Sequence, residues 1–128
     1  MRIVVALGGN ALLKRGEPMT HENQRANIRV AAQALAPVAK EHQLVVAHGN
    51  GPQVGFILRR SEIAAKTEGM HELPLDVCGA ESQGFIGYAL QQNLQNELYQ
   101  RGIKKKVVTV ITQVLVDKND PAFQSPSK

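Results

Sequence analysis

Two kinds of hydrophobic pattern alternate along the chain, and each predicts a different element. Short apolar runs at residues 2–7 and 44–47 each end at a glycine-containing segment, as expected for strands buried on both faces. A third run, residues 107–111, follows Gly102 and a lysine cluster and continues through Thr112 and Gln113 to the apolar residues 114–116. We therefore predict three strands.

Between these runs, apolar residues recur at spacings of three and four, which predicts helices. The first covers about residues 20–40, with Thr20 as its N-cap. Pro37 is expected to kink this helix or to end it early. The apolar positions that define it are Ile28, Ala31, Ala32, Leu35 and Ala39.

Two further helices precede the third strand. One should begin near Pro52, because proline favours the first turn, and direct its apolar positions toward the sheet. The other should run from about Pro74 to Arg101 and be capped by Gly102. The apolar positions of the helix that begins near Pro52 are Val54, Ile57, Leu58 and Ala65. The helix that begins near Pro74 contains three glycines, Gly79, Gly84 and Gly87, and close packing is the simplest reason for them.

The order of strands and helices predicts an α/β fold with a parallel sheet and right-handed crossovers. Three strands would leave two sheet edges exposed, and such a unit is poorly closed. Residues 117–128 are polar and rich in turn residues, so we expect them to begin a lobe or loop that is cut off. Residues 1–128 would then form one part of a larger domain.

Composition narrows the classes of function. The 128 residues are 43% hydrophobic and 20% charged, which suits a globular core. Only 4% are aromatic, with no tryptophan, so base stacking and nucleic-acid binding are disfavoured. One cysteine, Cys78, excludes an internal disulfide and fits a reducing, cytoplasmic compartment. The apolar N-terminal run is too short for a signal peptide or a membrane span.

Fifteen Lys and Arg against eleven Asp and Glu give a net charge of +4, which would suit a phosphorylated substrate. The densest basic run, residues 104–106, is interpreted as a solvated loop. His21, His42 and His71 do not have metal-ligand spacing, and no metal site is predicted.

Two glycine-asparagine turns carry the candidate chemistry. Gly8, Gly9 and Asn10 follow the first strand, and the segment His48-Gly49-Asn50-Gly51-Pro52 follows the second. The carboxyl ends of neighbouring parallel strands meet at one sheet edge, where ligands bind. Glycine admits a ligand close to backbone N–H groups, so an anion is favoured, although tight turns also require glycine. Neither turn has Walker or G-x-G-x-x-G spacing.

His48 has two interpretations. It could act as a general acid or base, or it could orient the glycine turn through a backbone hydrogen bond, and the second is favoured. Cys78 is interpreted as a small buried hydrophobic residue rather than a nucleophile.

The two turns, with their flanking residues 4–11 and 48–55, resemble signature segments of the carbamate kinases, in the amino-acid kinase superfamily. Further segments that resemble this family, in the same order, are residues 73–78, 82–84, 86–88 and 110–114. The resemblance spans essentially the whole chain but less than half of the family's length. It implies a three-layer α/β sandwich with a mainly parallel sheet, present here in incomplete form.

The same resemblance implies a reaction: reversible phosphoryl transfer between ATP and carbamate, giving ADP and carbamoyl phosphate, with Mg2+. Gly8, Gly9 and Asn10 would line the transferred phosphoryl group. His48 and the three residues after it, Gly49, Asn50 and Gly51, would hold carbamate or its phosphorylated form. Most nucleotide contacts would lie in the C-terminal part of the family, so the 128 residues are expected to be inactive alone. The resemblance also implies a homodimer.

Three departures keep other functions open. Lys128 falls where the family has a lysine near the substrate, but serines at 125 and 127 replace the family's asparagine and threonine. Gly79 replaces a larger apolar residue, and Pro37 interrupts a helix that continues in the family. A divergent member acting on another small acid or amide, and a non-catalytic anion-binding remnant, are the alternatives.

Overall fold

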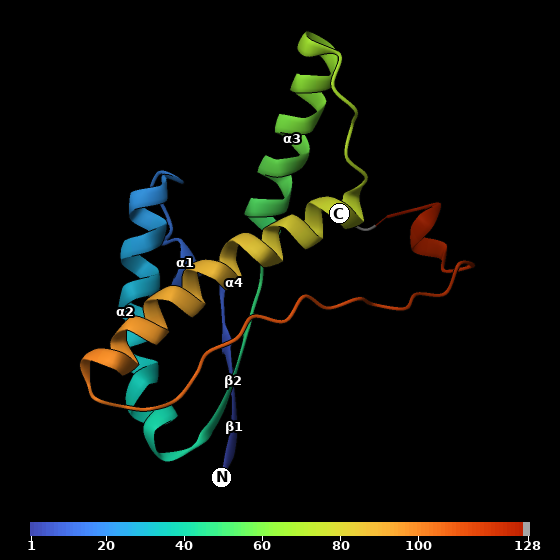
Figure 1. Ribbon diagram of the computed structural model, residues 1–128. Coiled ribbons are helices and arrows are strands. Elements are labelled where there is room, and N and C mark those ends of the chain that lie inside the picture. The colour runs from blue at the N-terminus through green and yellow to red at the C-terminus, as the bar shows by residue number, and fades with distance from the viewer. Residues whose placement is uncertain (127–128) are drawn as a thin grey trace.

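A computed structural model describes residues 1–126 (Figure 1). Strands β1 (Arg2–Leu7) and β2 (Gln43–His48) lie side by side in parallel, with Arg2 opposite Gln43 and Leu7 opposite His48. The crossover between them contains the short helix α1 (Gly9–Leu12) and the long helix α2 (His21–Glu41). Both strands and the parallel pairing agree with the sequence-based prediction.

Helix α2 begins as predicted, and it does not end early at Pro37. Thr20 caps the helix by accepting a hydrogen bond from the Asn23 amide at 3.2 Å, and the helix continues through Pro37 to Glu41. A proline inside a helix deprives the carbonyl four residues earlier of its donor. Here the Arg101 guanidinium donates to that carbonyl, the oxygen of Gln33, at 3.3 Å.

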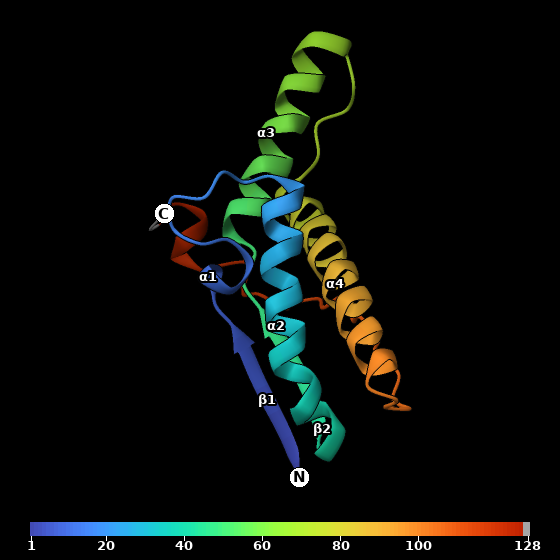
Figure 2. The same ribbon diagram turned by 90° about the vertical axis from the view of Figure 1, so that its left-hand side faces the viewer.

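Helix α4 (Leu75–Gln100) packs beside α2 on one face of the two strands (Figure 2). The core that these elements share is aliphatic, and half-buried residues of both strands pack against it. Its buried members are Ala32, Leu35, Ala36, Ala39, Leu94 and Leu98. The opposite face of the strands carries Val4 and Val45, which are 67% and 48% exposed. The described residues thus supply the sheet and one helical layer of the expected sandwich.

Helix α3 (Gly51–Glu68) was predicted to lie against the sheet, but it does not. It starts beside Pro52 as expected, but it packs on α4 and extends away from the strands (Figure 1). Its C-terminal half is joined to the following loop, because the Leu73 amide donates to Ser61 Oγ at 2.7 Å. The apolar residues assigned to the sheet, among them Val54 and Ile57, are half-buried instead.

The predicted third strand is extended, but within residues 1–126 no strand pairs with it. Glutamine side chains of α4 hold it instead. The Val107 amide donates to Gln95 Oε1 at 3.0 Å, and Thr109 Oγ1 donates to Gln91 Oε1 at 2.8 Å. The prediction failed because the pattern indicates an extended chain, whereas a strand also requires a neighbour. The rest of the tail includes a short 3-10 turn, Pro121–Phe123.

Gly87 of α4 allows this segment to lie close to the helix, as the packing interpretation of the helix glycines predicted. A Cβ at Gly87 would lie 2.2 Å from Thr109 Cγ2. At Gly84 it would only touch Ile111 Cδ1 at 3.7 Å, and at Gly79 it would meet nothing within 4 Å. One of the three glycines is therefore required by packing in the described chain.

The basic run at residues 104–106 is exposed, as its interpretation as a solvated loop requires, but Lys105 also makes specific contacts. Its ammonium group donates to the backbone oxygens of Ala39, Lys40 and His42, the last at 2.9 Å. These carbonyls belong to the last turn of α2 and its C-cap, where hydrogen-bond donors and positive charge are both favourable. Lys105 thus joins the end of α2 to the extended segment.

Candidate functional site

The two glycine-asparagine turns lie together at the carboxyl ends of the strands, as predicted. Leu7 is opposite His48 in the parallel ladder, and the Gly49 amide donates to the Leu7 carbonyl at 3.4 Å. This bond joins the last residue of β1 to the first residue after β2. The turns therefore form one site at the sheet edge.

The glycines of this site are not explained by backbone conformation or by packing. The glycines with positive φ in residues 1–126 are Gly16, Gly69 and Gly102, none of which belongs to either turn. A Cβ placed on any glycine of the site would meet nothing within 4 Å; these glycines are Gly8, Gly9, Gly49 and Gly51. The tight-turn explanation is thus weakened. The open space fits a ligand that approaches the backbone.

Asn50 is held in a fixed orientation by a serine far along the chain. Its Nδ2 donates to Ser82 Oγ at 2.7 Å, and Ser82 Oγ donates to the Gly79 carbonyl at 2.7 Å. Ser82 is fully buried, so its hydroxyl group is shielded from water. The sequence placed Ser82 within a family-like segment but gave it no role, because the contact joins residues 32 positions apart.

The start of helix α3 adds backbone donors to the site. Asn50 is the N-cap, but its side chain makes no capping hydrogen bond, and the first turn carries no acidic residue. Pro52 has no N–H, so the first turn of this 18-residue helix offers the amides of Gly51 and Gln53, which add positive partial charge at the site. This arrangement favours a bound anion.

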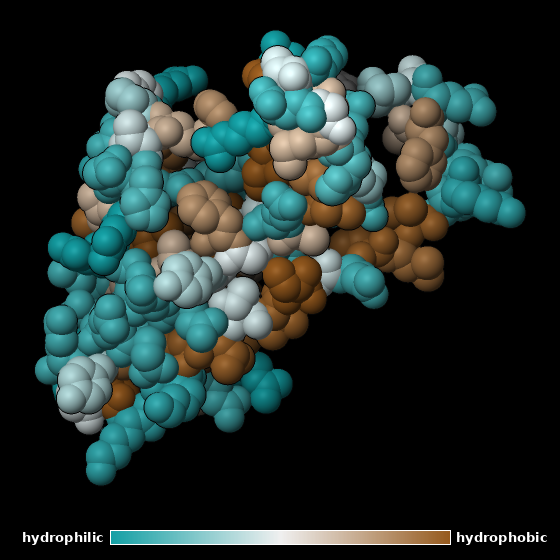
Figure 3. Space-filling view, turned by 45° about the horizontal axis from the view of Figure 1, so that its top comes forward, coloured by the Kyte–Doolittle hydropathy of each residue, from teal (hydrophilic) through white to brown (hydrophobic). Residues whose placement is uncertain are grey.

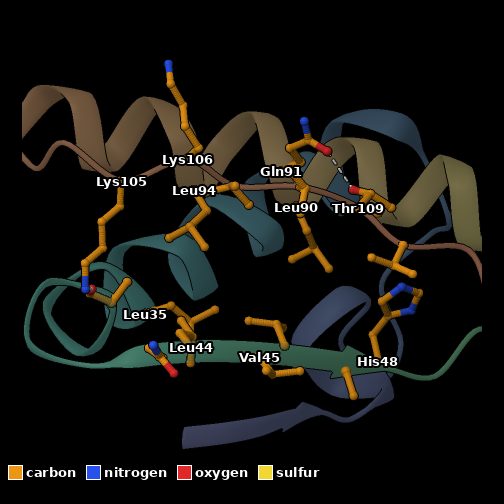
Figure 4. Close-up of a pocket in the computed structure, with 18 of the residues that line it drawn as sticks. Leu35, Leu44, Val45, His48, Leu90, Gln91, Leu94, Lys105, Lys106 and Thr109 are labelled. Atoms are coloured by element: carbon orange, nitrogen blue, oxygen red, sulfur yellow. Dashed lines mark hydrogen bonds between the residues drawn. The ribbon is translucent and has the colours of Figure 1, made fainter. Parts of the chain in front are cut away.

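The contacts of His48 favour a role in orienting the glycine turn over a role in acid–base catalysis. Its Nδ1 lies 3.1 Å from the Gly49 carbonyl, which can only accept, so the ring donates there. The ring projects from the end of β2 toward α4 (Figure 4). Asn10 is exposed in α1, beside the open glycine turn.

The remaining site expectations concern Lys128 and metals. Lys128 lies outside the described residues. Among residues 1–126, no three His, Cys, Asp or Glu side chains come close enough to hold a metal ion. Nor does this part of the chain contain a helix long and apolar enough to cross a membrane. Cys78 is buried, as its interpretation as a hydrophobic residue requires.

Known proteins resemble the chain over its whole length. It is 56% identical to the carbamate kinase of Rhizobium meliloti over 100% of this chain and 38% of that protein. With the carbamate kinase of Pyrococcus furiosus the identity is 52% over 99% of this chain and 41% of the relative. The carbamate kinase-like protein YahI of Escherichia coli is 50% identical over 98% of this chain and 40% of its own.

Solved structures resemble the fold as well. The carbamate kinase from Giardia lamblia bound to AMP-PNP superimposes with a TM-score of 0.92 at 42% identity, covering 99% of this chain and 44% of that one. The chain thus spans about two fifths of the length of the relatives it matches. The model of the "Amino acid kinase family" matches residues 1–124. From its glycine turns to its extended tail, the chain belongs to the amino acid kinase family.

Proposed function

We propose that the chain is the N-terminal, substrate-side part of an enzyme that transfers a phosphoryl group reversibly between ATP and carbamate, giving ADP and carbamoyl phosphate. The observation that carries this proposal is the joining of two open glycine-asparagine turns by the bond from the Gly49 amide to the Leu7 carbonyl. It is supported by relatives that are carbamate kinases at about 50% identity.

Phosphoryl transfer depends mainly on alignment and charge stabilisation. In this proposal Gly8, Gly9 and Asn10 line the transferred phosphoryl group. The turn after β2 holds carbamate or carbamoyl phosphate, with Asn50 presented by Ser82 and the first α3 amides facing the anion. His48 keeps that turn in place through its bond to the Gly49 carbonyl.

The phosphate groups of ATP fit the open backbone at the two turns, because no Cβ fills that space. The nucleotide base is assigned to the part of the family beyond the matched region. A Mg2+ ion would neutralise phosphate charge, but the described residues offer no carboxylate cluster to hold it. No step is therefore assigned to a metal ligand of residues 1–126, and Lys128 is proposed as a further cationic group.

The test uses a chimera in which residues 1–128 replace the matched region of the Rhizobium meliloti carbamate kinase. ATP formation from carbamoyl phosphate and ADP is measured in a coupled assay. Asn50→Ala should lower kcat/KM by about 100-fold, as expected when one oriented donor to a developing charge is removed. Ser82→Ala should lower it by about 10-fold, because Ser82 only positions Asn50, and Ser82→Thr should restore most of the activity.

Ser61→Ala is the matched control. It removes another buried serine hydrogen bond, the one that Ser61 accepts from the Leu73 amide, in the C-terminal half of α3. Activity should remain within about 2-fold of the unsubstituted chimera, because a uniform loss of packing does not change transition-state contacts. Equal losses for Ser61→Ala and Asn50→Ala would contradict the assignment of Asn50.

A different acceptor is the second candidate, favoured by 50% identity to a protein described only as carbamate kinase-like. The fold fixes phosphoryl chemistry, whereas loops select the acceptor. The chimera should therefore be assayed with a panel of small carboxylates and amides. Activity with an amino-acid carboxylate and none with carbamate would decide for this candidate.

A cytoplasmic homodimer completes the proposal. Apolar side chains are exposed on one face of the molecule (Figure 3), and those of α3 and α4 form part of this surface. The larger ones on these two helices are Phe56, Ile63, Leu75, Val77, Phe85, Tyr88 and Tyr99. Sedimentation of the chimera should give twice the monomer mass, and a monomer at all concentrations would refute the dimer.

A further inference from the structure

Asn50 and Gly51 are neighbours whose groups can react with each other. An asparagine side chain carries an amide carbon, Cγ, that the backbone nitrogen of the next residue can attack. Glycine at that next position leaves the nitrogen unshielded, because it has no Cβ. Gly51 is exposed, and a Cβ placed on it would meet nothing within 4 Å. Solvent therefore reaches the nitrogen that would attack.

The amide of Gly51 also lacks the hydrogen bond that protects amides in the body of a helix. Gly51 is the first residue of α3, and first-turn amides have no carbonyl partner within the helix. Within residues 1–126 no carbonyl of another element accepts from it, and the Asn50 side chain makes no capping hydrogen bond. None of the other asparagines in the sequence precedes a glycine. The pair is thus distinct in both sequence and structure.

Two hydrogen bonds hold Asn50 away from the geometry of this reaction. At its ψ of 13°, the Gly51 nitrogen is nearly eclipsed with the backbone nitrogen of Asn50 and is turned away from the side chain. Reaching Cγ requires rotation of the peptide between the two residues, which carries the Asn50 carbonyl away from the Val54 amide, its donor at 3.0 Å. The side chain must also turn, and this breaks the 2.7 Å bond from Nδ2 to Ser82 Oγ. Both bonds have to open before a ring can close.

We propose that Asn50 is a deamidation site that the Ser82 hydroxyl keeps latent in the folded chain. The Gly51 nitrogen bonds to Asn50 Cγ, the bond from Cγ to Nδ2 breaks, and Nδ2 leaves as ammonia with the proton that the Gly51 nitrogen gives up. Water then opens the resulting succinimide ring at either of its two carbonyl carbons. The net reaction is asparagine plus water giving ammonium and a carboxylate, on aspartate or on isoaspartate, whose backbone is one carbon longer.

Ser82 suits this protective role because its own contacts are fixed. Its hydroxyl is fully buried and donates to the Gly79 carbonyl at 2.7 Å, so its lone pairs are left to accept from Nδ2 of Asn50. After deamidation a carboxylate stands in place of this amide, and a carboxylate has no hydrogen to donate. It would also put a negative charge beside the open glycine turns. Deamidation would therefore convert a turn that favours anions into one that repels them.

Deamidation is measured at neutral pH in the chimera, folded in buffer and unfolded in guanidinium chloride. Peptide mapping by mass spectrometry locates the residue at which NH is replaced by O, and chromatography separates aspartate from isoaspartate. In the unfolded chimera, Asn50 should react before the other asparagines of residues 1–128, with isoaspartate among the products. In the folded chimera it should react at least about tenfold more slowly, because both restraints must open first. Equal rates in the two states, or aspartate as the only product, would overturn the proposal.

Substitutions at two serines and one glycine test the role of Ser82. Ser82→Ala should speed the reaction in the folded chimera about fivefold, as expected when a local opening no longer breaks one hydrogen bond. Ser82→Thr keeps the hydroxyl and should restore a rate within about twofold of the unsubstituted chimera. Gly51→Ala should nearly stop the reaction in both states, because a Cβ then shields the attacking nitrogen.

Ser61→Ala is the matched control. It removes a buried serine hydrogen bond that does not involve Asn50, so the rate at Asn50 should be unchanged. If Ser61→Ala speeds the reaction as much as Ser82→Ala does, or if Ser82→Ala leaves the rate unchanged, the proposal is wrong. The readout is a covalent change, so it does not depend on whether the chimera is active or on which acceptor it uses.

Discussion

Replacing Gly87 by alanine tests whether the extended segment lies on α4 as described. The new Cβ would lie 2.2 Å from Thr109 Cγ2, 3.2 Å from its Oγ1 and 3.3 Å from its Cβ. Rotation of the threonine side chain would move Cγ2 and Oγ1 but not Cβ, so residue 109 also has to shift by a few tenths of an ångström. The movement would also break the bond from Thr109 Oγ1 to Gln91 Oε1.

The expected magnitude follows from opposing effects. Overpacking costs about 1–3 kcal/mol, and the lost hydrogen bond costs about 1 kcal/mol. Alanine regains about 1 kcal/mol over glycine inside a helix. Gly87→Ala should therefore lower the free energy of unfolding by about 2 kcal/mol.

Two other glycines of α4 provide matched controls. Gly79→Ala meets no atom within 4 Å and should raise the free energy of unfolding by up to about 1 kcal/mol. Gly84→Ala makes only ordinary contact with Ile111 and should be close to neutral or mildly stabilising. In a Thr109→Gly background the clash is removed, so Gly87→Ala should become stabilising.

Urea unfolding followed by far-UV circular dichroism measures these changes. The same variants can be made in the chimera, so that a chain without a cooperative transition does not prevent the measurement. If Gly87→Ala stabilises the protein as much as Gly79→Ala, residues 105–112 do not lie against α4.

Three further predictions concern contacts away from the site. Lys105→Met should lower the free energy of unfolding by about 1–2 kcal/mol, because carbonyls at the end of α2 lose a charged donor; an unchanged urea midpoint would contradict this. Arg101→Met should cost less, about 0.5–1 kcal/mol, because water can replace the donor to the exposed Gln33 carbonyl; a loss as large as that of Lys105→Met would contradict it. The hydrogen bond from Asn27 lowers the pKa of Glu17 below its ordinary value of 4.5. The stabilisation by this carboxylate should be complete above about pH 4.5 and disappear as pH falls through the lowered pKa. The melting temperatures of the unsubstituted chain and of Glu17→Gln should therefore converge in acid. A difference that stays constant with pH would contradict this.

The sequence predicted what depends on local patterns. The strands at residues 2–7 and 44–47, the Thr20 cap and the start of the helix at Pro52 all follow from neighbours a few positions away. The meeting of the two turns followed from a rule for parallel strands rather than from any one residue. These predictions are confirmed.

The errors concern contacts between distant parts of the chain. Pro37 does not end α2, since tertiary packing outweighs local propensity and Arg101 supplies the missing donor. Lys105 lies among lysines, and only the fold places it at the end of α2. The pairing of Ser82 with Asn50 gave no periodic signal. For residues 107–111, the apolar pattern was sufficient to predict an extended backbone but not to predict which strand pairs with it.

The glutamines of α4 hold the extended segment in one register, although no strand within residues 1–126 pairs with it. A helix rises about 6 Å over four residues, and an extended chain rises about 6.6 Å over two. Gln95 and Gln91 therefore meet Val107 and Thr109 in step. A shift of two residues would keep this spacing, but it would place a different side chain over Gly87. The fit of Thr109 against Gly87 thus sets the register of this extended segment along α4, and an insertion of one residue between residues 103 and 109 would change that register and reverse the faces of its side chains.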